Sequence, residues 1–180
     1  VAPSIHTDPQ APGLVPPPSP TAPAAGETQP VHCGAVDGLL GAMLATTVKK
    51  FGDHEAFVAF GSSMTYDKFW KKSRKLAIFL QKKLGLKKDD RIALMMPNIM
   101  QYPIALFASW MCGLVVVNVN PLYTAPELVK QLRDSDVATI IVLANFAHEL
   151  QHAVSETRVR NVIVTEVGDA CGLIKSFFIN

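Results

Sequence analysis

The sequence lacks the short signatures that identify nucleotide-binding enzymes and serine hydrolases. It contains no G-x-G-x-x-G, no G-x-x-x-x-G-K-[S/T], no Ser/Thr/Gly-rich loop followed by lysine, and no G-x-S-x-G. An enzyme that uses ATP must hold its phosphates with backbone amides or lysine, and a serine hydrolase presents its nucleophile on a tight turn. The 180 residues therefore show no phosphate-binding loop and no set of nucleophile, base and orienting group.

The sequence also has few cysteines and a small net charge. Cys33, Cys112 and Cys171 lie far apart, and Cys112 sits inside an apolar run, which is not the arrangement of a disulfide framework. We therefore expect a reducing, cytoplasmic setting. The formal net charge of +2 is too small to indicate a nucleic-acid partner, so none is expected.

Charged residues are absent from residues 92–126, which raises the question of a membrane-spanning helix. Prolines and asparagines interrupt this stretch, and its longest apolar piece, residues 102–117, is shorter than the roughly 20 residues that a spanning helix needs. Two strands with a buried helix between them explain the pattern better. No secretory signal is visible at the start of the sequence.

Residues 1–37 are predicted to form a proline-rich tail. Pro, Ala, Ser and Thr dominate this segment, and almost nothing in it can build a core. We expect it to be disordered or polyproline-like, and residues 38–180 to form the folded part. Pro17 and Pro20 have the P-x-x-P spacing that SH3 and WW domains bind, although such matches arise easily by chance.

The remaining residues predict an α/β domain. Apolar positions at three- and four-residue spacing indicate a helix over residues 38–51, and a hairpin follows over residues 56–66. Beyond residue 90, continuous apolar runs alternate with helical patterns, as in a sheet that helices cover on both faces. We therefore predict a mostly parallel, doubly wound sheet flanked by helices. The expected strands are 92–96, 114–119, 138–143 and 161–165, and the expected helices between them are 98–112, 125–133 and 147–155.

The helix predicted for residues 66–84 is amphipathic and strongly basic. Its apolar stripe must face a core, and Gly85 is expected to end it. Lysine and arginine greatly outnumber aspartate over residues 66–88. This excess of positive charge is consistent with contact to an anionic membrane surface, and a solvated helix face is the alternative.

His148, Glu149 and His152 form an H-E-x-x-H motif on a predicted helix. In zinc proteases this spacing places two imidazoles one turn apart with a glutamate base between them. Such a site needs a third protein ligand, and the common extension would require glycine and histidine where the chain has Ser155 and Arg158. A zinc hydrolase therefore stays an alternative. The favoured interpretation is a surface helix, and no metal site is expected.

Several segments together resemble one enzyme family. Residues 64–69 (MTYDKF) are similar to the LTYxEL element near the start of adenylation domains, and residues 108–118 (ASWMCGLVVVN) to the KAGxxxVPxxP element. The sequence resembles bacterial-type long-chain fatty-acid:CoA ligases more closely. The segments that carry this resemblance are RIALMMPN at 91–98, QYP at 101–103, VNVNPLYT at 117–124 and NFAH at 145–148. The likeness covers roughly residues 39–180, which resemble the N-terminal portion of such a ligase.

This resemblance implies the N-terminal lobe of the acyl-CoA synthetase fold and a two-step reaction. Fatty acid and ATP form an acyl-adenylate and pyrophosphate with Mg²⁺, and CoA then displaces AMP. ATP, CoA, Mg²⁺, a long-chain fatty acid and a homodimeric state are therefore expected of a longer parent protein. The 180-residue chain is expected to be an inactive fragment, because the family's phosphate-binding loop and catalytic lysine would lie beyond it.

No catalytic or cofactor-binding residue is carried over from the family. Asn98, Asn118, Asn120 and Tyr123 are the candidates for the neighbourhood of the acyl pocket. They are predicted to lie where strands end, on the side where open α/β sheets gather ligands. The alternative is that they only satisfy hydrogen bonds of local turns.

Overall fold

A four-stranded parallel sheet organises the part of the chain that the structure describes. The computed structural model describes residues 39–59 and 61–168, so the predicted tail at residues 1–37 lies outside it. The elements run in the order α1 (Leu39–Phe51), β1 (Glu55–Ala59), β2 (Ser62–Thr65), α2 (Tyr66–Lys82), β3 (Arg91–Met95), α3 (Gln101–Met111), β4 (Val115–Asn118), α4 (Ala125–Asp134), β5 (Thr139–Leu143), the short 3-10 helix η1 (Ala144–Phe146), α5 (Ala147–Val154) and β6 (Asn161–Thr165).

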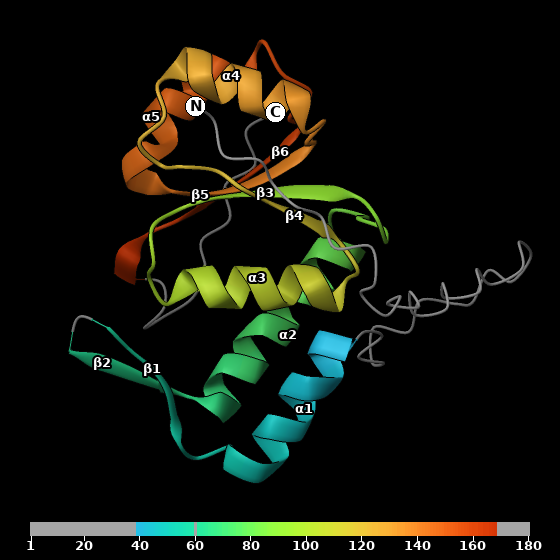
Figure 1. Cartoon of the computed structure of the whole chain (residues 1–180), viewed down its shortest axis with the longest axis vertical. Coiled ribbons are helices and arrows are strands. Elements are labelled where there is room, and N and C mark those ends of the chain that lie inside the picture. The colour runs from blue at the N-terminus through green and yellow to red at the C-terminus, as the bar shows by residue number, and fades with distance from the viewer. Residues whose placement is uncertain (1–38, 60, 169–180) are drawn as a thin grey trace, which may run out of the picture. The chain divides into compact units, whose positions relative to one another are not determined.

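The strand order in the parallel sheet is β4-β3-β5-β6. Leu94 of β3 pairs with Asn118 of β4 on one side and with Ile141 of β5 on the other. Figure 1 shows the sheet between two helical layers, with α4 and α5 above it and α3, α2 and α1 below. The predicted α/β fold with a mostly parallel sheet flanked by helices is confirmed.

Each strand carries a run of at least three apolar residues, as expected when each face of the sheet is covered by a different helical layer. Side chains alternate between the two faces along a strand. Leu94, Ile141 and Ile163 therefore pack in the core shared with α1, α2 and α3. Ile140 and Val142 pack in the core shared with α4 and α5. In β5 all five residues are buried, as a central strand of a covered sheet requires.

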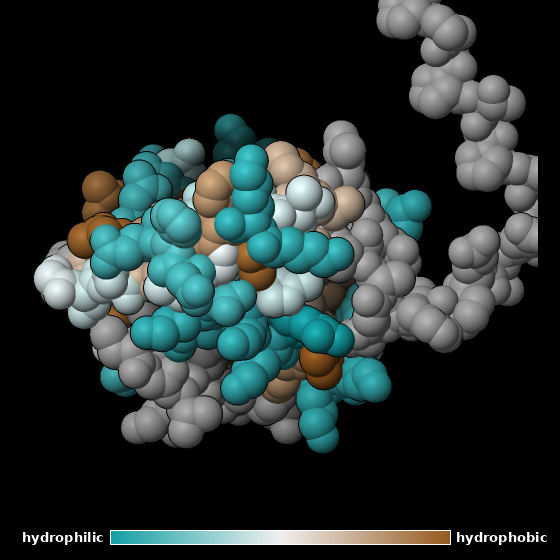
Figure 2. Space-filling view, turned by 90° about the horizontal axis from the view of Figure 1, so that it is seen from below, coloured by the Kyte–Doolittle hydropathy of each residue, from teal (hydrophilic) through white to brown (hydrophobic). Residues whose placement is uncertain are grey.

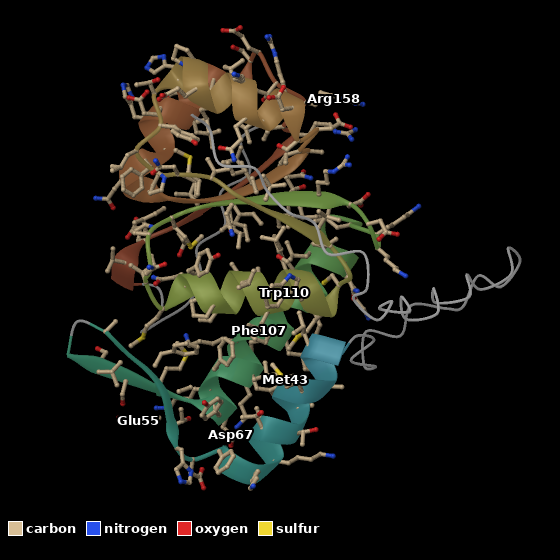
Figure 3. The ribbon with its side chains drawn as sticks, in the orientation of Figure 1. Met43, Glu55, Asp67, Phe107, Trp110 and Arg158 are labelled. Atoms are coloured by element: carbon tan, nitrogen blue, oxygen red, sulfur yellow. The ribbon has the colours of Figure 1, made fainter. Side chains whose placement is uncertain are left out.

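A row of aromatic rings joins the lower helical layer to the β1–β2 hairpin. Phe69 of α2 contacts Phe57 of β1 edge-to-face, with ring centroids 5.0 Å apart, and Phe107 of α3 at 5.3 Å. Phe107 also contacts Trp110 at 5.1 Å, and both side chains lie on the part of α3 that faces α2 (Figure 3). Edge-to-face pairs add to the stability that ring burial supplies.

The element boundaries differ from the sequence prediction chiefly at the start of α3. This helix begins at Gln101 instead of residue 98, because Ile99 N–H donates to the Pro97 carbonyl at 2.8 Å and closes a separate turn. Pro103 then falls in the first turn of α3, where a missing N–H costs no helical hydrogen bond. None of the helices in the described residues has the length and apolar character that crossing a bilayer requires.

Candidate functional site

The carboxyl ends of the parallel strands lie along one edge of the sheet, which we call the carboxyl edge (residues 96–100, 118–124, 144–146 and 166–168). The chain leaves β3 toward α3 on one face, whereas it leaves the neighbouring β5 through η1 toward α5 on the other face. Adjacent loops therefore diverge between β3 and β5. Such a divergence is the usual ligand-binding position in open α/β sheets, so this edge is the candidate site.

Asn118 ends β4 and is held by helices on both faces of the sheet. Its side-chain Oδ1 accepts a hydrogen bond from the Tyr102 hydroxyl of α3 at 3.0 Å. Its backbone carbonyl accepts one from Gln131 Nε2 of α4 at 2.9 Å. The residue thus connects both helical layers to the end of one strand, which is a structural role.

Asn120 shapes the turn that follows β4. Its Oδ1 accepts from Leu122 N–H at 3.1 Å, and its carbonyl accepts from Tyr123 N–H at 3.2 Å. This is the side-chain-to-backbone pattern of an Asx turn. The turn leaves Leu122 78% exposed and lets the half-buried Tyr123 pack against the core that α4 and α5 share.

A capping box fixes the start of α4 beside this turn. Glu127 Oε2 accepts from Thr124 N–H at 2.9 Å and from Thr124 Oγ1 at 2.8 Å. Both hydrogen bonds favour the ionised carboxylate and so hold the pKa of Glu127 below its usual value of 4.5, and the bond from the backbone N–H has the larger effect. The charge also lies at the positive end of the helix dipole.

Gln101 bridges the carboxyl edge from β3 to β6. Its Nε2 donates to the Glu166 carbonyl at 2.6 Å and to the Val167 carbonyl at 2.9 Å. Only 6% of this residue is exposed. The strand β5 lies between β3 and β6 in the sheet. The Gln101 amide therefore connects the start of α3, which follows β3, to the chain that leaves β6 on the other side of β5.

The structure places all four predicted residues on the carboxyl edge but does not test a contact with substrate. Asn118, Asn120 and Tyr123 share one loop, and Asn98 is exposed at the end of the adjacent strand β3. Asn120 makes the local turn bond that the alternative describes, whereas Asn118 accepts from side chains of α3 and α4. Sequence reasoning missed the bridging role of Gln101. Its signal was an amide at the start of the predicted buried helix, one of four amides in the uncharged stretch 92–126.

The glutamate and the two histidines of the H-E-x-x-H motif have different surroundings. Glu149 Oε2 accepts from the N–H of Ala125, the first residue of α4, at 3.1 Å. His148 and His152 are both exposed, with their Nε2 atoms 3.2 Å apart. Within the described residues no three His, Cys, Asp or Glu side chains gather as metal ligands. The zinc-hydrolase alternative is not favoured, since its third ligand is missing there and its glutamate serves α4.

Two grooves lie away from the four residues predicted to border the acyl pocket. An apolar groove of about 710 Å³ runs between α5 and β6, and Leu150, Val154 and Val162 are among the residues that line it. A polar groove of about 510 Å³ lies at the opposite, amino edge of the sheet, beside Asp136 and Arg158, which form an ion pair at 2.7 Å. Neither groove includes Asn98 or Tyr123.

The outer side of α2 carries the basic stripe, which we define as Lys68, Lys71, Lys75 and Lys82. These four lysines are exposed and share the side of the helix opposite the buried Phe69 and its neighbours. Lys71 is 4.0 Å from Asp67, an exposed contact of small energy. Figure 2 views the molecule from below the orientation of Figure 1 and shows many hydrophilic side chains on the described surface, with apolar residues among them.

Comparisons with known proteins agree on one family. The family model described as "AMP-binding enzyme" matches residues 44–175. A long-chain-fatty-acid–CoA ligase of Escherichia coli O157:H7 is 48% identical over 138 residues, which are 77% of this chain and 25% of that protein. One of Salmonella typhimurium is 50% identical over 131 residues, 73% of this chain and 23% of that protein. The chain thus spans about a quarter of the length of these curated relatives.

Solved structures show the same fold. The crystal structure of a long-chain-fatty-acid-CoA ligase from Archaeoglobus fulgidus is similar with a TM-score of 0.65. It is 23% identical, and the similarity covers 77% of this chain and 31% of that one. At this identity the likeness establishes the architecture alone.

Replacing Gln101 by glutamate should destabilise the carboxyl edge. A carboxylate of the same shape cannot donate to the two carbonyls and would bring a buried charge against them, so we expect a loss of about 3 kcal/mol in the free energy of unfolding. Urea unfolding measures it. The matched control is Gln151→Glu on the exposed side of α5, for which about 0.5 kcal/mol or less is expected. Equal effects of the two variants would contradict the bridging role of Gln101.

Replacing Glu127 by glutamine should lower stability in a pH-dependent way. Because the pKa of Glu127 is depressed in the folded state, its contribution is present above the unfolded pKa and is lost as the pH falls through the folded pKa. The difference in unfolding free energy between wild type and Glu127→Gln should therefore be largest near neutrality and shrink below about pH 4.5. Urea unfolding at several pH values measures it, and a difference that is constant with pH would contradict the capping-box explanation.

Proposed function

The chain belongs to the AMP-binding enzyme family, and on this premise we propose that it forms the N-terminal part of a long-chain fatty-acid:CoA ligase. The observation that carries the proposal is the near 50% identity to proteins of that name across about three quarters of the chain. The proposed reaction joins a fatty acid to CoA through an acyl-adenylate. The carboxylate oxygen attacks the α-phosphorus of ATP and pyrophosphate leaves; the CoA sulfur then attacks the acyl carbon and AMP leaves.

The residues of this chain do not by themselves fit ATP, CoA or Mg²⁺. The sequence offers no glycine-rich phosphate loop, and the described residues gather no group of three acidic, histidine or cysteine side chains. We therefore assign the binding of ATP, CoA and Mg²⁺ to the longer protein and derive no catalytic step from residues of this chain. Its own contribution is the scaffold of the carboxyl edge.

We place one wall of the acyl pocket at the loop of residues 118–124. Tyr123 is half-buried behind an ordered turn, so its ring can border a fatty-acid chain without rearrangement of the loop. Asn98 lies exposed at the adjacent strand end and is the other candidate. Asn118 and Asn120 support the loop through the hydrogen bonds described above.

A segment exchange tests this function. Residues 39–168 would replace the aligned segment of the Escherichia coli relative, and the chimera would be assayed for acyl-CoA formation from a long-chain fatty acid. We expect an active chimera, because the exchanged segments share nearly half of their residues. The unmodified Escherichia coli ligase is the control. A folded but inactive chimera would contradict the proposal.

The 180-residue chain alone should show no ATP–pyrophosphate exchange with fatty acid and Mg²⁺. Exchange by this chain would overturn the assignment of ATP binding to the longer protein. These two assays separate the family function from the activity of the chain itself.

We further propose that the basic stripe contacts an anionic membrane surface. Lysines on one exposed helix side are attracted to anionic lipid head groups by about 1 kcal/mol each. Ile78, which is 36% exposed, lies between Lys75 and Lys82 and adds an apolar contact. A cytoplasmic location, as the separated cysteines suggest, would place the stripe near such a surface. A homodimeric parent protein stays a prediction.

Vesicle sedimentation tests the membrane contact. The protein should sediment with vesicles of phosphatidylcholine and phosphatidylglycerol but not with phosphatidylcholine alone. Changing Lys68, Lys71, Lys75 and Lys82 to glutamine should weaken this binding by about tenfold or more. The matched control changes four exposed cations elsewhere, namely Lys49, Lys50, Lys130 and Arg160. Equal loss in both variants would contradict a stripe-specific contact, since each removes four positive charges.

A further inference from the structure

Two exposed imidazoles on α5 lie with their Nε2 atoms close together. His148 and His152 are one helical turn apart, both are exposed, and their Nε2 atoms lie 3.2 Å from each other. Their rings are perpendicular, with centroids 4.5 Å apart. We call these two residues the histidine pair. Their separation in sequence alone does not bring Nε2 atoms together, because exposed side chains on adjacent turns can also point apart.

The separation of the two nitrogen atoms suits a shared metal ion. Imidazole nitrogen binds zinc and similar ions at about 2.0–2.1 Å, so two nitrogens on one ion lie about 2.9–3.4 Å apart when the bond angle is between square and tetrahedral. The observed 3.2 Å lies within this range. Without metal, the same distance suits a hydrogen bond in which one ring donates its Nε2–H to the other. When both Nε2 atoms bind a metal ion, the donating ring instead carries its proton on Nδ1.

We propose that the histidine pair is a surface binding site for one divalent transition-metal ion of the kind that prefers imidazole, namely Cu²⁺, Ni²⁺ or Zn²⁺. Two protein nitrogens hold the ion, and water fills its other positions. The site departs from the sequence-based expectation of no metal. It also differs from a zinc hydrolase, because Glu149 is bonded to Ala125 and no third ligand gathers there among the described residues.

The position of α5 makes the pair rigid enough to act as a chelate. On the opposite side of this eight-residue helix, Leu150 and Ala153 are buried, and Glu149 connects the helix to α4 by its hydrogen bond with Ala125 N–H. Little backbone freedom is then lost when the ion binds. Hard cations such as Mg²⁺ prefer oxygen ligands and should not bind, whereas Cu²⁺ should bind most tightly of the three proposed ions. The proposal does not depend on the ligase function.

Paramagnetic NMR with Cu²⁺ tests the site and reports its place. Adding CuCl₂ to the ¹⁵N-labelled 180-residue protein should broaden amide signals of residues 147–154 first. Either His148→Gln or His152→Gln should abolish this local broadening. The matched control His54→Gln removes an exposed histidine between α1 and β1 and should leave the broadening intact.

The two variants are expected to fold, since both side chains are exposed, and their metal-free spectra verify it. Isothermal titration calorimetry with NiCl₂ and ZnCl₂ provides the second measurement. MgCl₂, which should not bind, is the negative control. Broadening centred elsewhere, or unchanged α5 broadening in either single variant, would overturn the proposal. Metal binding by other histidines or cysteines of the chain would appear as broadening that does not follow the His148 and His152 substitutions.

Discussion

Burial of the parallel sheet on both faces is the constraint on which the described structure depends. A central strand such as β5 can be buried at every position only if two separate helical layers cover it. Alternation then sends Ile141 to the core with α3 and Ile140 to the core with α4. A shift of one residue in the register of β5 would exchange the two sets, so both cores together hold the strands in register.

That constraint also decides what the carboxyl edge can do. Parallel pairing brings the ends of β3, β4 and β5 together, and the two helical layers require the loops to leave in opposite directions. Polar groups exposed by these strand ends must find partners, and several of them do so within the protein. Asn118 accepts from Tyr102, and Asn120 accepts from its own turn. The edge is therefore an ordered scaffold.

The sequence predicted this framework because hydrophobic patterns are local. Residues 161–165 were predicted as a strand and form β6, and the buried helix before β4 was distinguished from a membrane span by its length. The predicted start of α3 was wrong by three residues, because the turn at Pro97 is made by backbone groups that leave no hydrophobic pattern in the sequence. Contacts between distant residues were not predictable: Gln101 reaches Glu166, and only the strand order brings them together.

The H-E-x-x-H motif shows why spacing alone does not determine chemistry. Residues four apart share a helix face, whereas the next residue after His148 points about 100° away from it. In α5 that rotation brings Glu149 to the orphan amide at the start of α4, because the two helices pack side by side on one face of the sheet. The histidines stay in solvent with their Nε2 atoms together. The neighbouring helix therefore holds the glutamate apart from the two histidines, whose Nε2 atoms form a separate unit.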